Sequence, residues 1–267
     1  MNFDPCAHLE AICDIARAAG RRILEVYERG FTVEHKDDRS PLTEADRAAH
    51  EVISAGLRRL TPDIPVLSEE SAKAEYAARA GWKRFWLVDP LDGTREFINR
   101  NGEFTVNIAL IDDGRALLGV VYVPVARLIY YACAGQGAYK QQGDAEARAV
   151  RARRFDGGKP IVVASRSHAG PETEAFLKSL GEHDVVSMGS SLKLCLVAEG
   201  AADVYPRLGP TMEWDTAAAQ CVVEVAGGRV ADLDGRPLVY NKADLHNPWF
   251  IVSGAGGYDW RRHLPSA

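Results

Sequence analysis

Residues 85–94 read Phe85-Trp86-Leu87-Val88-Asp89-Pro90-Leu91-Asp92-Gly93-Thr94. The four apolar residues at the start of this stretch predict a short buried strand, which stops at Asp89 and delivers polar groups at its end. Pro90 fixes its own φ and restricts Asp89, while Gly93 lets the backbone turn sharply. The carboxylates of Asp89 and Asp92 are therefore expected to converge on one side of a loop.

A loop of this kind suits a hard cation. Mg²⁺ needs oxygen ligands in near-octahedral geometry and leaves room for a substrate phosphate, so Asp89, Asp92 and the carbonyl of Leu91 are candidate ligands. The backbone N–H groups of Gly93 and Thr94 are candidate donors to phosphate oxygens. Taken alone, the stretch also fits a surface turn, because Asp, Pro and Gly are common turn residues.

Two other acidic motifs do not fit this loop. A haloacid-dehalogenase-type phosphatase has a second Asp two positions after its nucleophilic Asp, whereas Asp89 and Asp92 are three positions apart. An EF-hand is also excluded, because neither the alternating acidic ligands nor the terminal Glu of a calcium loop is present.

The sequence on either side of the loop predicts layered α and β structure. Apolar residues recur at helical spacing over residues 4–30 and again over residues 43–61, which predicts two amphipathic helices. Residues 104–134 contain three β-rich runs separated by turn residues, which predicts an antiparallel meander. The polar segment 136–159 predicts a junction between two lobes, and short strands such as 161–164 then alternate with helical patterns.

The charge balance argues against a nucleic-acid polymer as partner. The chain has 267 residues, a net charge of -5 and 46% hydrophobic residues, so it can bury a sizeable core but has no basic field for DNA or RNA. An acidic protein that handles phosphates needs a cation between the two negative groups. Bound metal is the expected solution.

The five cysteines are odd in number, scattered and without a zinc-binding spacing, so they are interpreted as reduced thiols that mostly serve packing. The N-terminus lacks the basic and then apolar order of a signal peptide. The most apolar stretch, 104–111, is far shorter than the roughly 20 residues of a membrane helix. These features predict a cytoplasmic protein without a transmembrane segment, and they leave peripheral attachment to the inner membrane open.

Further carboxylates have two readings each. Glu69 and Glu70 follow the apolar pair Val66-Leu67, so a second short strand can deliver them to the same site, although acids also favour the first turn of a solvated helix. Asp46 fits a capping pattern with Thr43 as well as a catalytic placement. Asp215 precedes an apolar helical run, as either a site residue or the N-cap of that helix.

Together these segments resemble the inositol monophosphatase superfamily, and most specifically its CysQ-type 3'(2'),5'-bisphosphate nucleotidases. The resemblance extends over nearly the whole chain and is carried by residues 42–46, 69–70, 89–107, 189–193 and 205–216. It implies an α/β sugar-phosphatase fold, an α-β-α-β-α sandwich. The expected organisation is one catalytic domain over residues 1–267, with an N-terminal α+β lobe to about residue 140 and a C-terminal α/β lobe from about residue 160.

The resemblance also implies a metal site and a pair of residues that activate water. Two or three Mg²⁺ ions are expected on Glu69, Asp89, Asp92, Asp215 and the carbonyl of Leu91. Glu70 would contact the metals indirectly or bind a third ion. Asp46 and Thr94 match the family's dyad that activates water, and a threonine hydroxyl paired with a carboxylate is chemically suited to that task.

Substrate recognition is implied at a second set of positions. Gly93 and Thr94 would hold the phosphate that is cleaved, and the positions matched for nucleotide recognition are Ser190, Lys193, Arg207 and His168. Arg and Lys are suited to a second phosphate. Structural readings stay open for all four: Ser190 and His168 as capping or surface residues, and the two cations as solvated charges.

The implied reaction is Mg²⁺-dependent hydrolysis of the 3'-phosphate of adenosine 3',5'-bisphosphate, or of its sulfated relative, by direct attack of metal-activated water. AMP and phosphate are the products, and the expected setting is sulfur metabolism. The expected partner is a small phosphorylated nucleotide, with a homodimer left open. The alternatives are an inositol or sugar monophosphatase and a catalytically silent regulator that binds metal or nucleotide.

Overall fold

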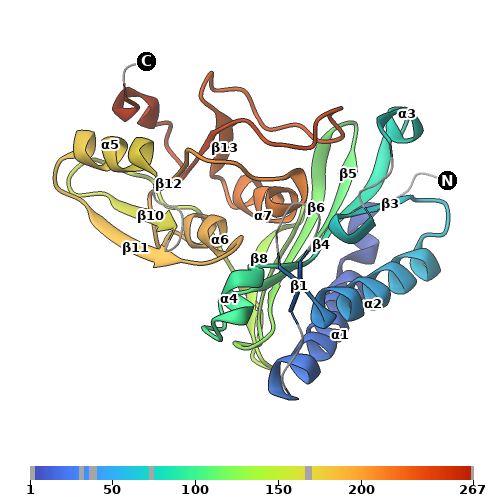
Figure 1. Ribbon diagram of the computed structural model, residues 1–267. Coiled ribbons are helices and arrows are strands. Elements are labelled where there is room, and N and C mark those ends of the chain that lie inside the picture. Colours follow the sequence, from blue (N-terminus) through green and yellow to red (C-terminus); the bar gives the residue numbers. More distant parts are fainter. Residues whose placement is uncertain (1–3, 30–32, 36–40, 72–74, 166–169, 266–267) are drawn as a thin grey trace.

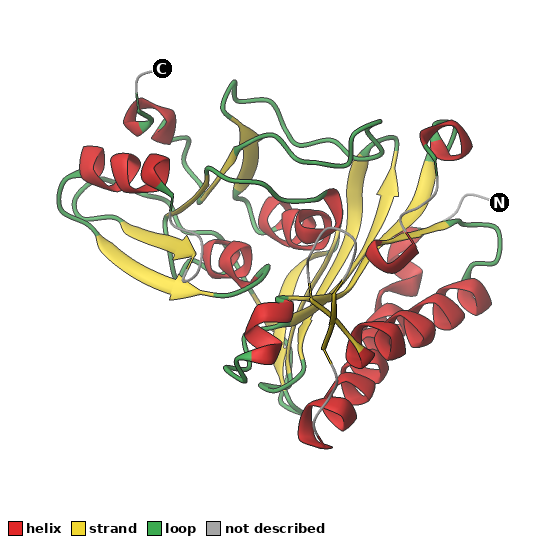
Figure 2. Ribbon diagram, viewed as in Figure 1, coloured by secondary structure: helices red, strands yellow, loops and turns green. Residues whose placement is uncertain are grey.

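The computed structural model of the chain describes residues 4–29, 33–35, 41–71, 75–165 and 170–265. Their helices and strands stack in the order helix, sheet, helix, sheet, helix (Figure 1). Figure 2 shows the same alternation by type of element. The α-β-α-β-α sandwich implied by the resemblance is therefore confirmed.

The first layer is a pair of long helices, as the apolar spacing predicts. Asp4 caps the short 3-10 turn η1 (Pro5–His8), and α1 (Leu9–Arg29) follows directly. The second helix, α2 (Glu44–Leu60), ends before Pro62. Both helices bury their apolar stripes against one face of the larger sheet, in a core that includes Ile12, Ile23, Ile53, Leu57, Trp86 and Val106.

The larger sheet has seven strands in the order β3-β4-β5-β6-β7-β8-β9. Its members are β3 (Val66–Ser68), β4 (Arg84–Asp92), β5 (Thr105–Asp112), β6 (Arg115–Val123), β7 (Leu128–Cys133), β8 (Gly137–Gln142) and β9 (Arg148–Ala149). Strands β5 to β7 form the predicted meander. Asp113 and Gly114 both have positive φ, at 45° and 76°, as a type I′ turn between β5 and β6 requires.

Two sequence expectations differ from the observed sheet. Segment 136–159 contains β8 and β9, which extend the larger sheet, so the change to the second sheet falls after Ala149. Strand β8 pairs with β7 and β9 pairs with β8, and this pairing stabilises the two strands. A polar edge strand has no apolar run that would reveal it in the sequence. Strand β4 also continues past Asp89 to Asp92 with an irregular register, because its partner β5 pairs with both residues. The division into two lobes stays a prediction.

The smaller sheet has five strands in the order β11-β10-β12-β14-β13. They are β10 (Ile161–Ser165), β11 (Asp184–Met188), β12 (Val204–Arg207), β13 (Arg229–Asp232) and β14 (Phe250–Ser253). Helices α6 (Leu192–Ala198) and α7 (Glu213–Val225) lie between the two sheets, and α5 (Pro171–Leu180) covers the outer face with the 3-10 turn η3 (Trp260–His263). The remaining elements are short: the pair β1 (Val33–His35) and β2 (Pro41–Thr43), η2 (Glu69–Ser71), α3 (Tyr76–Arg79) and α4 (Thr94–Ile98).

Helix α7 approaches the larger sheet closely because β6 has a glycine at the point of contact. A Cβ built on Gly119 would lie 2.1 Å from the carbonyl oxygen of Ala218 and 2.9 Å from Cβ of Cys221. Only a residue without a side chain allows this approach. Among the described residues, no helix is both long and apolar enough to span a membrane.

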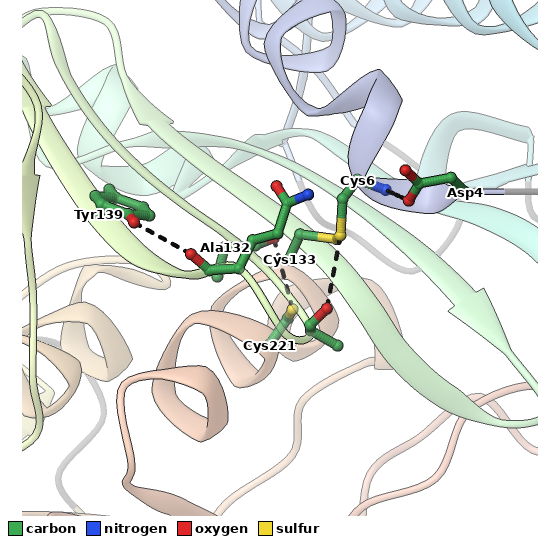
Figure 3. Close-up of a disulfide and its surroundings, with 8 residues drawn as sticks. Asp4, Cys6, Ala132, Cys133, Tyr139 and Cys221 are labelled. Carbon is green, nitrogen blue, oxygen red and sulfur yellow. Dashed lines mark hydrogen bonds between the residues drawn. A yellow bond between two sulfur atoms is a disulfide. The ribbon is translucent and has the colours of Figure 1, made fainter.

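Cys6 and Cys133 form a disulfide, with their Cα atoms 5.6 Å apart (Figure 3). It joins η1 to the end of β7 across 127 positions of sequence. The interpretation of all five cysteines as reduced thiols is therefore wrong for this pair, because cysteine spacing does not reveal that the start of the chain lies beside the meander. The interpretation as buried packing thiols is confirmed for the free residues Cys13, Cys195 and Cys221.

The disulfide makes a prediction for stability. Cys6→Ser is expected to lower the free energy of unfolding by about 2–5 kcal/mol, because the bridge restricts a long loop in the unfolded chain. Thermal unfolding checks this: dithiothreitol should lower the Tm of the wild type to that of the variant and leave the variant unchanged. Thiol titration of the denatured, unreduced protein should find three of the five cysteines reactive. Five reactive thiols would show that the pair is not formed.

Candidate active site

The ends of two neighbouring strands bring the first acidic residues together. Strands β3 and β4 are parallel, and Ser68 pairs with Val88. The next residues, Glu69 and Asp89, therefore leave the same edge of the sheet side by side. Asp89 also follows Leu87 on the face that packs against the middle helices. The strand expected to deliver Glu69 to the site is confirmed.

The loop after Asp89 is held by its own side chains. The backbone N–H of Leu91 donates to Oδ1 of Asp89 at 3.0 Å, and Gly93 takes the left-handed conformation with φ 90° at the start of α4. The sharp turn predicted at this glycine is confirmed. Asp92 accepts a hydrogen bond at Oδ2 from the backbone N–H of Ser191, at 2.6 Å. The loop is therefore fixed to the segment that precedes α6.

Asp215 completes the cluster from α7. It occupies the first turn of this helix, and its Oδ2 accepts from the backbone N–H of Met212 at 2.9 Å. The N-cap of α7 is Met212, so the reading of Asp215 as the N-cap is wrong: Asp215 is the third residue of the helix, and its side chain accepts from the backbone of the N-cap residue. Carboxylate oxygens of Asp89, Asp92 and Asp215 lie within 4.8 Å of one another. Three acids from distant parts of the sequence converge.

Burial and mutual repulsion raise the pKa values of these three carboxyls. Burial is the main cause at each. It raises the pKa of Asp92 to about 6, against the opposing effect of the Lys193 ammonium. The pKa of Asp215 rises to about 8, with repulsion from Asp92 as the second cause, and the pKa of Asp89 lies well above its usual range. The positively charged groups of the protein therefore do not fully neutralise the negative charge of these carboxylates.

The donor set fits a divalent hard cation. All convergent side chains are carboxylates, and the carbonyl of Leu91 belongs to a residue that lines the same cavity. Oxygen ligands alone are typical of Mg²⁺, Mn²⁺ or Ca²⁺ and not of a zinc site. A cation placed between the acids would remove the repulsion that raises their pKa values.

The acids line a cavity of about 240 Å³ whose wall also includes three positively charged residues, Arg95, Lys193 and Arg207. Lys193 is only 8% exposed, which excludes a solvated surface position, and burial lowers the pKa of its ammonium. Arg207 donates to the carbonyl of Pro210 at 2.6 Å, and its buried Nε has no partner. Ser190 lines the cavity with φ 44°, a strained conformation for serine, and its buried Oγ is unpartnered. Two residues that line the cavity therefore each have a buried polar atom with unused hydrogen-bonding capacity.

The remaining predicted site residues differ in how close they lie to the cavity. Gly93 and Thr94 line the cavity. Asp46 is buried in the first turn of α2, near enough to Asp89 to contribute to its raised pKa. Glu70 lies in η2, outside the residues that line the cavity. His168 falls outside the described residues.

Several residues of the cavity wall were not assigned by sequence reasoning: Arg95, Glu96, Ser191, Leu194, Tyr205, Thr211, Thr216 and Phe250. The Nζ atom of Lys193 lies 5.8 Å from the ring centroid of Tyr205, a cation–π contact. Six of them lie within the segments that carry the family resemblance, and this was the available signal: Arg95, Glu96, Ser191, Tyr205, Thr211 and Thr216. The aromatic residues lie on strands of the second sheet, where they resemble ordinary core residues in sequence.

The raised pKa values predict that metal binding releases protons. At pH 7 the metal-free protein keeps a proton on Asp215, whose pKa is about 8, and the cation requires the ionised carboxylate. Affinity for Mg²⁺ is expected to fall about tenfold or more from pH 8 to pH 6. Calorimetric titration in two buffers of different ionisation enthalpy measures the released protons. Affinity independent of pH, without proton release, would contradict the prediction.

The same raised pKa values predict how the stability of the metal-free protein changes with pH. Because these carboxyls hold protons more tightly in the folded state than in the unfolded chain, the metal-free protein should lose stability as pH rises through 6 and 8. Added Mg²⁺ should therefore raise the Tm more at pH 8 than at pH 6.

The comparisons with known proteins agree with one another over most of the chain. The model of the inositol monophosphatase family matches residues 7–256. The 3'(2'),5'-bisphosphate nucleotidase CysQ of Escherichia coli (strain K12) is 52% identical over 248 residues, which span 92% of this chain and 99% of that protein. The crystal structure of CysQ from Bacteroides thetaiotaomicron has a TM-score of 0.82 at 45% identity, covering 96% of this chain and 100% of that one. Inositol monophosphatase from Anabaena (Nostoc) sp. PCC 7120 has a TM-score of 0.75 at 25% identity, covering 97% and 96%.

Proposed function

The chain belongs to the inositol monophosphatase family, and from this premise we propose that it is a 3'(2'),5'-bisphosphate nucleotidase. The reaction is hydrolysis of the 3'-phosphate of adenosine 3',5'-bisphosphate, or of its sulfated relative, to AMP and phosphate. The observation that carries the proposal is the convergence of Asp89, Asp92 and Asp215 in a cavity that also contains Lys193 and Arg207. Relatives that are 52–53% identical over 92% of the chain are named 3'(2'),5'-bisphosphate nucleotidase CysQ.

The family is metal-dependent, and we propose Mg²⁺, in two or three ions, as the metal here. The proposed ligands are Glu69, Asp89, Asp92, Asp215 and the carbonyl of Leu91. Bound there, Mg²⁺ would lower the pKa of the attacking water and neutralise negative charge on the phosphate. The protein's own part is to hold these oxygens in place before the substrate arrives.

Asp46 and Thr94 are the proposed residues that orient water and accept its proton. Thr94 is the first residue of α4 and lines the cavity, while Asp46 is a buried carboxylate from another element. A hydroxyl that orients water, next to a carboxylate that accepts charge, is general-base chemistry. We assign Glu70 a supporting role beside the metals.

The second phosphate distinguishes a bisphosphate nucleotide from a monophosphate. We assign its recognition to Lys193 and Arg207, with Ser190 and His168 as further nucleotide contacts. The backbone of Gly93 and Thr94 receives the phosphate that is cleaved. The unpartnered Nε of Arg207 and Oγ of Ser190 support this assignment, because buried polar atoms without partners are costly unless a ligand satisfies them.

One consequence concerns substrate choice. Lys193→Met is expected to raise KM for adenosine 3',5'-bisphosphate by about tenfold or more, since a charge-assisted hydrogen bond to phosphate is lost. KM for a monophosphate substrate should change much less, and steady-state kinetics on both substrates measures the difference. Equal increases for the two substrates would contradict a role at the second phosphate.

The experiment that tests the whole proposal is a phosphate-release panel with Mg²⁺. It compares adenosine 3',5'-bisphosphate, its sulfated form, AMP, inositol phosphate and fructose bisphosphate on one preparation. The two bisphosphate nucleotides are expected to have the highest kcat/KM. A wide preference for inositol phosphate would make the protein a sugar phosphatase with the same metal chemistry. Absence of turnover, with calorimetric binding of nucleotide retained, would favour a silent regulator.

The cytoplasm is the proposed location, as expected for an enzyme of small sulfur metabolites. The Cys6–Cys133 disulfide makes this part testable, because disulfides are rare in reducing compartments. Thiol alkylation of intact cells followed by mass spectrometry should find the pair reduced if the protein resides there.

A further inference from the structure

Strand β5 has two buried polar residues on one face of an otherwise apolar strand. Thr105 and Asn107 are 0% and 1% exposed, and the alternating residues Val106 and Ile108 pack against the first helical layer. Thr105 and Asn107 therefore point toward the middle layer. Buried polar side chains are costly unless they form hydrogen bonds, so this pair requires an explanation.

The pairing of β5 with β4 places the two polar residues opposite the two acids. Thr105 pairs with Asp92, and Asn107 pairs with Asp89. Side chains opposite each other on neighbouring strands lie about 5 Å apart at Cβ. The polar pair thus lies directly behind the acidic loop.

Ser191, from the segment before α6, joins this pair to Asp92. Its Oγ lies 2.9 Å from Oγ1 of Thr105 and 2.8 Å from Oδ1 of Asn107. Oγ1 of Thr105 lies 3.5 Å from Oδ2 of Asp92, the same oxygen that accepts from the backbone N–H of Ser191. These contacts form a continuous chain of hydrogen bonds from Asn107 through Ser191 and Thr105 to the carboxylate of Asp92.

The orientation of the Asn107 amide decides which group donates and which accepts in each of these hydrogen bonds. With Oδ1 toward Ser191, the buried Nδ2 has no hydrogen-bond partner. In that orientation the Ser191 hydroxyl donates its proton to Oδ1 of Asn107. The Thr105 hydroxyl then has one proton for two acceptors, Oγ of Ser191 and Oδ2 of Asp92, so one of the two contacts is left without a donor. Rotating the amide by half a turn exchanges its two similar ends. The amide then donates to Ser191, Ser191 donates to Thr105, and Thr105 donates to Asp92.

We propose that Asn107, Ser191 and Thr105 form a directional hydrogen-bond relay that positions the carboxylate of Asp92. Its Oδ2 then accepts from two donors, the Thr105 hydroxyl and the Ser191 N–H. No described donor hydrogen-bonds to Oδ1, which leaves this oxygen for the cation. The inference rests on the proposed function, in that Asp92 is a metal ligand, and it makes Thr105, Ser191 and Asn107 positioning residues.

The relay also joins parts of the chain that are distant in sequence. Asn107 and Thr105 belong to the larger sheet, whereas Ser191 precedes a helix that packs against both sheets. Loss of the relay is therefore expected to weaken metal binding, through the orientation of the Asp92 carboxylate, and also to lower the stability of the fold. Ligand carboxylates fixed by hydrogen bonds from behind bind metal more tightly than free ones.

The test measures Mg²⁺ binding to the metal-free protein by calorimetry, alongside Tm. Thr105→Val keeps the shape and removes the donor, and it is expected to raise the Kd for Mg²⁺ about tenfold. Thr105→Ser restores the hydroxyl and should return Kd to within about twofold of wild type. Thr61→Val is the matched control: this buried threonine accepts from Nε1 of Trp86 at 2.8 Å, away from the site, so its loss should lower the Tm without changing Kd.

A double variant tests the chain of donors. If the relay is a single unit, Ser191→Ala combined with Thr105→Val should bind Mg²⁺ within about twofold of Thr105→Val alone. Multiplied effects would show independent hydroxyls and overturn the relay. Wild-type Kd in Thr105→Val, or equal weakening in Thr105→Ser, would also overturn it.

Asp92→Asn separates this inference from the proposed function. If Asp92→Asn loses metal affinity while Thr105→Val keeps it, the metal site stands and the relay fails. If Asp92→Asn binds Mg²⁺ like the wild type, the assignment of Asp92 as ligand fails.

Discussion

Asp92→Asn is expected to lower kcat/KM for adenosine 3',5'-bisphosphate by at least about a thousandfold. Metal coordination at a phosphoryl centre is worth several kcal/mol, and each 1.4 kcal/mol is about tenfold in rate. The substitution preserves size and the hydrogen bond from the Ser191 N–H, but it removes one negative charge from the acidic cluster. The loss should therefore be specific to metal binding and turnover.

Steady-state kinetics over a range of Mg²⁺ concentrations measures this effect. Excess Mg²⁺ should restore part of the activity, because weaker binding is the main defect. Asp113→Asn makes the same chemical change at an exposed residue of the β5–β6 turn, where φ is 45° and Asn is well tolerated. It should retain full activity. Undiminished turnover in Asp92→Asn would remove this residue from the site.

Gly119→Ala is expected to cause the largest loss of stability from a single methyl group. The added Cβ would lie 2.1 Å from the backbone oxygen of Ala218, so either β6 or α7 must move. Overpacking against backbone costs about 3 kcal/mol or more, which corresponds to a Tm lower by roughly 10 °C. Activity should fall as well, because α7 carries Asp215 and a displacement of about 1 Å can cost about a hundredfold.

Gly81→Ala is the matched control for this prediction. A Cβ at Gly81 would meet no atom within 4 Å, so this variant should have the Tm and kcat of the wild type. Thermal unfolding and kinetics on both variants separate the effect of contact from that of losing a glycine. Equal Tm values for the two variants would contradict the close packing of α7 on β6.

Local patterns in the sequence were sufficient to predict the first helical layer and the meander. Helices α1 and α2 have continuous apolar stripes, and β5 to β7 have apolar runs separated by turn residues. Each of these signals lies within a few residues of its effect. Strand β9 could not be predicted in this way, because its two exposed residues belong to the sheet only through pairing with β8.

The acidic cluster could be predicted in composition, although its geometry depended on distant contacts. Asp89 and Asp92 were recognisable from the turn residues between them, and Asp215 through family resemblance. The contact between Ser191 and Asp92 crosses 99 positions of sequence, and the Cys6–Cys133 bridge crosses 127. No local pattern encodes such contacts, since they follow from how the layers stack.

The position of α7 between the two sheets has a consequence during protein synthesis. The larger sheet is complete at Ala149, but α7, which covers its inner face, ends at Val225. At about 5–20 residues per second, a nascent chain on the ribosome exposes that apolar face for about 4–15 s before the covering helix is made. Phe85, Leu87 and Ile111 are then a surface that chaperones can bind, and the catalytic pocket is among the last parts of the protein to form.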